Sequence, residues 1–165
     1  MSTVVIRTAK VEDYPRIVEL NEASVVETSP MDHDRLVTLN ALAQIHWVAE
    51  VDGCVEAFLL AMQKGSTYES VNFEWFDARY DNFLYIDRIV VAEGCRQRGV
   101  ASQMYEKLFL EAARLGVDFI CAEINVEPPN QISMDFHRKY RFEEVGSQSV
   151  QEGTKRVSLQ RARVK

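Results

Sequence analysis

One stretch of the chain, residues 83–124, restricts the possible folds more than any other. It begins with an apolar run at residues 83–91, continues through a turn into apolar residues at helical spacing, and ends in a second apolar run at residues 119–124. Gly116 follows the helical stripe at the position where a glycine often ends a helix. Two apolar strands joined by an amphipathic helix predict a parallel crossover unit in which both strands are buried.

The segments on either side predict further strands and helices. Asp52-Gly53 separates two β-prone runs, residues 46–51 and 54–60, and is a strong hairpin signal. We expect the second helix, which runs through residues 36–43, to start at Ser29, with Ser29 as its N-cap and Pro30 in the first helical position. The remaining predictions are a strand at residues 4–6, helices at 14–25 and 132–140, and strands at 142–150 and 155–163.

The composition is that of one globular domain covering residues 1–165, with 47% hydrophobic and 27% charged residues. The net charge of -6 argues against nucleic acid as a partner and suits a cationic acceptor better. Cys54, Cys95 and Cys121 form no CxxC pair and have no histidine at ligand spacing, so we expect neither a metal site nor a disulfide framework. No run reaches the ~18 apolar residues of a membrane span, and no secretory signal pattern is present, so the prediction is a cytoplasmic protein without a membrane partner.

The turn between the first apolar run and the helix has the properties of an anion site. A helix N-terminus presents unpaired N–H groups and a partial positive charge, and here no Ser, Thr, Asp or Asn stands directly before the helix. Gly99 lets a ligand approach the backbone, and Arg96 and Arg98 add positive charge. The residue types alone fit an exposed basic turn equally well. The chain has neither a GxGxxG nor a GxxxxGK[ST] motif.

Two motifs together point to a family. Arg96-x-x-Gly99-x-Ala101 resembles the [RQ]-x-x-G-x-[GA] signature of the GCN5-related N-acetyltransferase (GNAT) superfamily, and it lies in that family's order of strand, loop and helix. Residues 130–142 are similar to the family's second motif, N-x-x-[AS]-x-x-[FL]-Y-x-[KR]-x-G-F. The resemblance covers about residues 84–146. This sequence departs from the family pattern at His137, where the family has Tyr, and at Arg141, where the family prefers Gly.

The resemblance implies a fold and a cofactor site. The fold would be α/β (α+β), with a mixed, largely antiparallel central sheet flanked by helices. Acetyl-CoA would lie in a splay between two central parallel strands, here residues 87–91 and 119–124. The implied cofactor residues are Ile89, Val90 and Val91 for the pantetheine arm, then Arg96, Gln97, Arg98, Gly99, Val100, Ala101 and Ser102 for the pyrophosphate, and finally Asn130, Ser133 and His137.

The implied activity is transfer of an acetyl group from acetyl-CoA to a primary amine of a small molecule or peptide, by direct attack in a ternary complex. The alternative is a module that binds acetyl-CoA without turnover, because the family tyrosine is missing at His137. A nucleotide- or nucleic-acid-binding protein is a third hypothesis, which the acidic charge and the missing motifs disfavour. A homodimer is compatible with all three.

Acetyl transfer needs proton movements, for which the resemblance suggests two residues. An amine with a pKa near ~10 must lose a proton, and the departing thiolate benefits from gaining one. Asp87 matches a strand position that is often acidic in the family, and it is either the base or a structural carboxylate paired with Arg88 or Arg79. His137 stands at the position of the acid, and its imidazole either transfers a proton or packs against the cofactor without chemistry.

Residues 65–82 are predicted to form a long irregular connection that is rich in aromatic side chains. Loops of this length inside a compact domain are often functional. The aromatic residues Tyr68, Trp75 and Tyr80 are therefore candidates for the wall of an acceptor pocket, and the alternative is that they only hold the connection in place.

Overall fold

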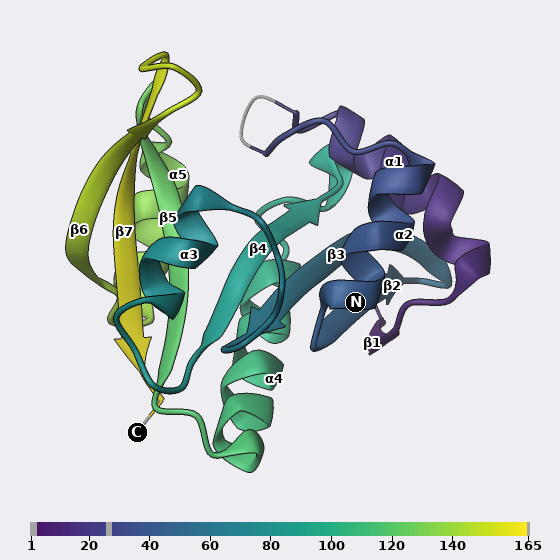
Figure 1. Ribbon diagram of the computed structural model, residues 1–165. Helices are drawn as coiled ribbons and strands as arrows, with labels where there is room; N and C mark the ends of the chain where they lie inside the picture. The colour runs from purple at the N-terminus through teal and green to yellow at the C-terminus, as the bar shows by residue number, and fades with distance from the viewer. Residues whose placement is uncertain (1–2, 26–27, 165) are drawn as a thin grey trace. The chain divides into compact units, whose positions relative to one another are not determined.

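The computed structural model describes residues 3–25 and 28–164. Its elements are β1 (Val4–Thr8), η1 (Val11–Asp13), α1 (Tyr14–Glu22), α2 (His33–Leu42), β2 (Ile45–Val51), β3 (Cys54–Gln63), α3 (Val71–Asp77), β4 (Leu84–Val91), η2 (Glu93–Cys95), α4 (Val100–Leu115), β5 (Phe119–Glu127), α5 (Gln131–Lys139), β6 (Glu143–Val150) and β7 (Lys155–Arg163). Within the described residues the strands form one seven-stranded sheet in the order β1-β2-β3-β4-β5-β7-β6 (Figure 1). β4 and β5 are parallel, whereas β1/β2, β2/β3, β5/β7 and β7/β6 are antiparallel. The predicted mixed, largely antiparallel α/β fold is confirmed.

The contacts within the chain divide it into two compact units. The first consists of Met1–Met62 and Ile86–Leu110, and the second of Gln63–Tyr85 and Glu111–Lys165. Strands β3 and β4 and helix α4 contribute residues to both units. The single domain expected for residues 1–165 stays a prediction.

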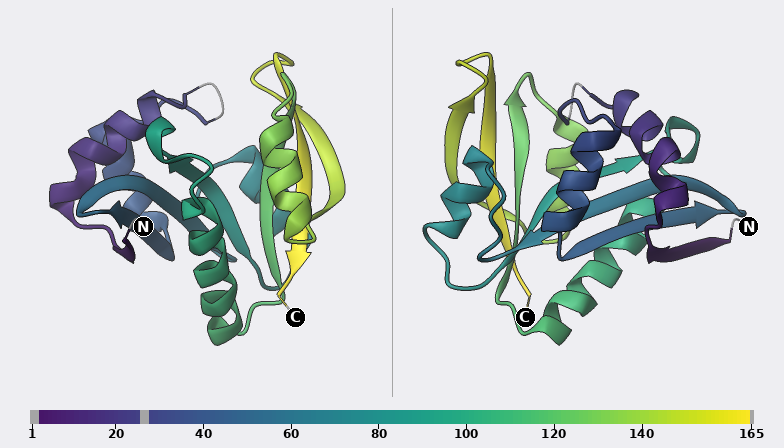
Figure 2. Two further views of the ribbon diagram at one scale, coloured as in Figure 1. Left: turned by 180° about the vertical axis from the view of Figure 1, so that it is seen from behind. Right: turned by 45° about the vertical axis from the view of Figure 1, so that its right-hand side comes forward.

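The first unit has helices on both faces of the β2–β3 hairpin. The hairpin turns at Asp52 and Gly53, whose φ angles of 51° and 88° are those of the predicted tight turn. His46 and Trp47 are neighbours on β2 and so point to opposite faces of the sheet. His46 bonds to Asn40 of α2, whereas Trp47 lies 5.2 Å below the ammonium group of Lys107 on α4. Helices α2 and α4 therefore cover opposite faces, which Figure 2 allows the reader to follow.

Both helices at the start of the first unit differ from their predicted bounds. α1 ends at Glu22 and does not reach residue 25, because Ala23 already forms its C-cap. α2 starts at His33, with Asp32 as its N-cap: the Asp32 carboxylate accepts a hydrogen bond of 2.8 Å from the backbone N–H of Arg35. The prediction that Ser29 caps this helix is wrong, because the hydroxyl and carbonyl of Ser29 accept hydrogen bonds from other side chains.

The second unit packs α3 and α5 on opposite faces of β5, β7 and β6. Trp75 of α3 lies against Gly146 of β6, where an added Cβ would come within 2.5 Å of the indole ring. Gly146 pairs with Leu159 of β7, and the next residue on that strand, Gln160, contacts Met134 of α5. Adjacent strand residues face opposite sides, so the two helices do as well (Figure 2).

The predicted irregular connection at residues 65–82 is wrong in its middle, where α3 forms. The hydroxyl of Ser70 caps this helix by accepting a hydrogen bond of 3.4 Å from the N–H of Phe73. Phe73 and Phe76, spaced three residues apart, are at most 1% exposed. They pack against Phe83 and Tyr85 with ring-centroid distances of 5.5–6.3 Å. This aromatic core stabilises a helix that is too short to form in isolation.

Helix α5 ends in a Schellman motif. Arg141 has a φ of 65°, in the left-handed region that favours glycine. The N–H groups of Arg141 and Phe142 donate to the carbonyls of Arg138 and His137 at 3.0 and 3.2 Å. The ring of Phe142 packs edge-to-face on that of His137 at 4.8 Å, which is the apolar contact typical of this motif. A non-glycine residue therefore occupies a position that glycine fits best.

The buried His46 should make stability depend on pH. His46 is 6% exposed, its Nδ1 lies 2.7 Å from Asn40 Oδ1, and among the described residues its Nε2 has no hydrogen-bond partner. Burial lowers the pKa of His46 to about 4, although the nearby charge of Asp13 opposes this shift. The unfolded chain binds this proton near pH ~6.5. The contribution of neutral His46 to the free energy of unfolding is therefore fully present above pH ~6.5 and is lost as the pH falls towards 4.

Replacing His46 by Gln should remove this dependence. When the pH is lowered from 7.5 to 4.5, we expect the unfolding free energy of the wild-type protein to fall by about 2 to 3 kcal/mol more than that of His46→Gln. Urea titrations at each pH measure this difference. His33→Gln is the matched control, because the side chain of His33 is 60% exposed. An equal loss in wild type and His46→Gln would contradict the prediction.

Replacing Arg141 by Gly should stabilise the protein. The substitution relieves a left-handed backbone at a non-glycine residue, so we expect the unfolding free energy to rise by about 1 kcal/mol. Arg141→Ala is the control, because it removes the same side chain and keeps the strained Cβ. Thermal or urea unfolding measures both variants, and equal gains in the two would show that backbone strain is not the cause.

Candidate active site

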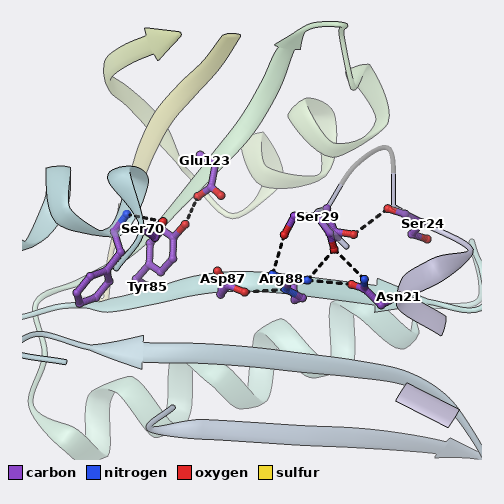
Figure 3. Close-up of polar contacts among 10 residues, drawn as sticks. Asn21, Ser24, Ser29, Ser70, Tyr85, Asp87, Arg88 and Glu123 are labelled. Carbon is purple, nitrogen blue, oxygen red and sulfur yellow. Dashed lines mark hydrogen bonds and ion pairs between the residues drawn. The ribbon is translucent and has the colours of Figure 1, made fainter. Parts of the chain in front are cut away.

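The Asp87 carboxylate on β4 is paired with the neighbouring guanidinium. Asp87 Oδ2 accepts a hydrogen bond of 2.7 Å from Nε of Arg88, and the two side chains are 5% and 4% exposed (Figure 3). Of the two partners expected for a structural Asp87, Arg88 is therefore the one observed. Arg79 donates to the carbonyl of Trp75 and stacks over its ring at 4.0 Å.

Arg88 also binds the segment that joins α1 to α2. Its Nη1 donates to Oδ1 of Asn21 and to the carbonyl of Ser29, both at 3.1 Å, and its Nη2 donates to Oγ of Ser29 at 3.0 Å. Asn21 adds a hydrogen bond of 2.8 Å to the same carbonyl (Figure 3). A buried guanidinium needs such acceptors, because an unpaired buried charge is strongly destabilising. Sequence reasoning missed this role of Arg88, because its partners Asn21 and Ser29 are 67 and 59 residues away along the chain.

The turn that precedes α4 has the backbone of an anion site. Gln97 and Gly99 have φ angles of 64° and 81°, on either side of Arg98. Alternating backbone conformations of this kind direct successive N–H groups to one side, where they can bind an anion. The carbonyl of Gly99 accepts the first helical hydrogen bond, 3.0 Å from the N–H of Gln103, so Gly99 is the N-cap. A glycine has no side chain with which to cap the first N–H groups of α4.

The surface over Gly99 is open. Among the described residues, its chain neighbours apart, a Cβ built on Gly99 meets no atom within 4 Å. Residues 96–99 are exposed, whereas Val100 turns into the core at 2% exposure. Arg96 is held by the carbonyl of Val91 and by Oγ of Ser24, both at 3.2 Å. A left-handed backbone at Gly99, two nearby guanidinium groups and an exposed surface fit a pyrophosphate. Ile89, Val90 and Val91 lie just before, at the end of β4.

The second motif forms the start and the face of α5. Oδ1 of Asn130 caps the helix by accepting a hydrogen bond of 3.2 Å from the N–H of Ser133. His137 lies one turn later and is 5% exposed. Its Nδ1 is 2.7 Å from the carbonyl oxygen of Ser133, which can only accept, so Nδ1 carries the proton. Burial lowers the pKa of His137, and the hydrogen bond to Ser133 opposes this only in part.

These contacts define the chemistry that His137 can perform. A neutral imidazole that donates through Nδ1 has its lone pair on Nε2, so Nε2 accepts hydrogen bonds and does not donate them. This arrangement, with the packing on Phe142, is the one expected of a packed helix histidine. The role as general acid stays a prediction, as does the contact with a cofactor.

The three aromatic residues predicted to line an acceptor pocket all pack within the second unit. Tyr68 is 6% exposed and lies 5.8 Å from Phe73. Trp75 packs on Gly146, and Tyr80 lies 5.5 Å from Phe119 and 5.3 Å from the guanidinium of Arg161. These contacts hold the connection in place, which was the alternative, and a role in binding acceptor stays a prediction.

The described residues contain neither a cluster of metal ligands nor a membrane-spanning helix. No group of three or more His, Cys, Asp or Glu side chains in residues 3–25 and 28–164 is arranged to hold a metal ion. In the same part of the chain, no helix has both the length and the apolar character needed to cross a membrane. Cys95, beside the turn, is 7% exposed and contacts Glu56 and Arg98 through its sulfur.

Comparison with known proteins gives both a family and structural neighbours. An N-acetyltransferase from Staphylococcus aureus Mu50 has a TM-score of 0.75 at 21% identity, with 99% of each chain covered. Ard1 from Thermoplasma volcanium has a TM-score of 0.79 at 16% identity, with 98% of each chain covered. The structure of yncA, a putative acetyltransferase from Salmonella typhimurium with its cofactor acetyl-CoA, has a TM-score of 0.72 at 20% identity and covers 98% of this chain and 94% of its own.

These structural likenesses show a shared fold. A search of the curated proteins gives no match. The model of the acetyltransferase (GNAT) family matches residues 11–142, which include both motifs. The chain therefore belongs to the acetyltransferase (GNAT) family.

Proposed function

We propose that this protein is an acetyl-CoA-dependent N-acetyltransferase that acts on a primary amine of a small molecule or peptide, by direct attack in a ternary complex. Membership of the family supports acetyl transfer in general. The observation that best supports acetyl-CoA as the cofactor is the backbone of the turn at residues 96–102. Gly99 is the N-cap and has no side chain, and the backbone is left-handed on both sides of Arg98. When bound, acetyl-CoA supplies an acetyl thioester as the electrophile.

The chain's own groups would bind this cofactor in three places. The amides of residues 99–102 and the guanidinium groups of Arg96 and Arg98 bind the pyrophosphate. The backbone of Ile89, Val90 and Val91 binds the pantetheine arm. Asn130, Ser133 and His137 on α5 add contacts to the same cofactor. The neighbour whose structure includes acetyl-CoA supports the choice of cofactor.

Asp87 is proposed as the base that takes the proton from the acceptor amine, directly or through a water molecule. The hydrogen bond from Arg88 to Oδ2 fixes the orientation of the carboxylate. A fixed carboxylate lowers the entropic barrier to proton transfer. A backbone N–H of β4 would stabilise the oxyanion that develops on the acetyl group.

A second function, acetyl-CoA binding without turnover, is favoured by one observation. The proton of the His137 imidazole is on Nδ1 and is donated to Ser133, so the residue at the position of the family acid is not poised to give a proton. Release of free CoA in the presence of a panel of primary amines separates the two functions. CoA binding without release for any amine would favour the binding module.

The partners follow from the same chemistry. We propose an acceptor of cationic character because the net charge is -6. Tyr68, Trp75 and Tyr80 are proposed to lie near this acceptor. Nucleic acid and membrane are not proposed as partners, a cytoplasmic location is proposed, and a homodimer is compatible with the function.

Gly99→Glu should abolish CoA binding. The new carboxylate stands where the phosphates bind, and we expect CoA affinity to fall at least ~100-fold in calorimetric titration, because like charges repel and the amides are blocked. Gly153→Glu is the matched control: Gly153 has a φ of 85° and open space like Gly99, and it lies in the β6–β7 turn. Undiminished CoA affinity in Gly99→Glu would rule out the proposed cofactor site.

His137→Phe should leave catalysis largely intact. Because the His137 proton is donated to Ser133 and burial lowers the pKa, we expect kcat and its pH profile to match those of wild type. Asp87→Asn is the comparison, with an expected loss of about 100-fold or more in kcat. Because Asp87 is also the counter-charge of the buried Arg88, the loss is assigned to proton transfer only if the circular dichroism spectrum and the CoA affinity of this variant match those of wild type. Loss of one limb of the pH profile in His137→Phe would instead assign it to proton transfer.

A further inference from the structure

Two arginines of the first unit bind the segment that joins α1 to α2. Arg88 of β4 donates hydrogen bonds to Asn21 and Ser29 of this segment (Figure 3). Arg96 of the turn binds the same segment at Ser24, whose Oγ accepts a hydrogen bond of 3.2 Å from Nη2 of Arg96. All these residues belong to the first unit. The end of α1 is therefore joined directly to the turn at residues 96–102.

The backbone of Ser24 is held by its neighbours in the chain. Ser24 is 7% exposed, and its N–H donates to the carbonyl of Asn21 at 3.0 Å. Its carbonyl accepts two hydrogen bonds from Thr28, at 3.1 Å from the backbone nitrogen and at 2.9 Å from Oγ1. Because these contacts keep Ser24 in one place, its hydroxyl can orient the longer and more flexible side chain of Arg96.

The guanidinium of Arg96 is held by two neutral acceptors. Its Nε donates to the carbonyl of Val91 at 3.2 Å, and its Nη2 donates to Oγ of Ser24 at the same distance. A guanidinium has more N–H donors than these two contacts use. Within residues 3–25 and 28–164 the other donors of Arg96 have no acceptor. The two contacts therefore fix the side chain without neutralising its charge.

This arrangement lowers the cost of binding an anion. Arg96 is exposed, and a long exposed side chain loses conformational entropy when a ligand orders it. A side chain that the protein already holds in place loses less, so more of the favourable contact contributes to affinity. The remaining N–H donors can form charge-assisted hydrogen bonds with phosphate oxygens.

We propose that Ser24 is a positioning residue for the cofactor, because it holds the guanidinium of Arg96 in the orientation that binds the pyrophosphate of acetyl-CoA. This inference rests on the proposed cofactor site at residues 96–102. It adds a residue that is 72 positions from Arg96 along the chain. Ser24 does not touch the cofactor and acts through Arg96. If the hydrogen bond only stabilised the fold, its loss would leave CoA affinity unchanged.

A double-mutant cycle tests the inference, with CoA affinity measured by calorimetric titration. Ser24→Ala removes the hydroxyl and keeps the backbone contacts, and we expect CoA affinity to fall by about threefold to tenfold, as for one lost hydrogen bond. Arg96→Ala should reduce the affinity by about tenfold or more, because it removes the charged contact itself. The double variant should bind CoA within about twofold of Arg96→Ala, because the Ser24 hydroxyl has no effect once its partner is gone.

Steady-state kinetics give a second readout that a purely structural role would not move. With an amine that is acetylated, Ser24→Ala should raise KM for acetyl-CoA and leave kcat within about twofold of wild type, because Ser24 affects binding of the cofactor and not the chemical step.

Thr28→Val is the matched control. It removes a hydroxyl that bonds to the carbonyl of Ser24, and among the described residues Thr28 makes no contact with Arg96. This variant should keep wild-type CoA affinity. Circular dichroism and urea unfolding of each variant separate a lost contact from a lost fold. An equal loss of CoA affinity in Thr28→Val and Ser24→Ala would assign the effect to the fold and overturn the inference.

Failure of the inference and failure of the proposed function give different results. A wild-type protein that binds no CoA would overturn the proposed cofactor site and this inference with it. CoA binding that Gly99→Glu abolishes and Ser24→Ala leaves unchanged would overturn the inference alone. Losses in Ser24→Ala and Arg96→Ala that add in the double variant would do the same, because the two residues would then act independently.

Discussion

The burial of the Arg88 guanidinium is the constraint on which much of the first unit depends. A charge with 4% of its side chain exposed is tolerated only where acceptors surround it. Asp87 supplies the counter-charge, and Asn21 and Ser29 supply neutral oxygens from α1 and from the segment before α2. The position of that segment is therefore set by β4. For the same reason Ser29 is not available to cap α2, and Asp32 does so three residues later.

Local patterns in the sequence were enough for much of the fold. The Asp52-Gly53 hairpin, the crossover through α4 and the strand–helix order of the second motif are confirmed, because each depends on neighbouring residues and on hydrophobic periodicity. Helix α3 was missed because it is short, with Phe73, Trp75 and Phe76 too close together to give one clear apolar stripe. Its Ser70 cap was the signal that could have revealed it.

The candidate site was predictable to a smaller extent. A turn at Gly99 that brings the backbone close to a ligand follows from residue types, and the φ of 81° at Gly99 is one that glycine adopts readily. The anion site itself stays a prediction. The contacts of Arg88 join segments far apart in the chain, which no spacing rule can anticipate. The protonation and hydrogen bonding of His137 were predictable in part. Ser133 is four residues earlier on the same helix, so a hydrogen bond between them was foreseeable, whereas the burial that lowers the pKa of His137 was not.

The packing of Trp75 on Gly146 also has a spectroscopic consequence. The chain has two tryptophans, and they fall in different units: Trp47 on β2 in the first and Trp75 on α3 in the second. Each indole has a cation over its ring, Lys107 at 5.2 Å and Arg79 at 4.0 Å, so each is sensitive to the packing of its own unit. Tryptophan fluorescence from this protein is thus the sum of two local reporters, one in each unit.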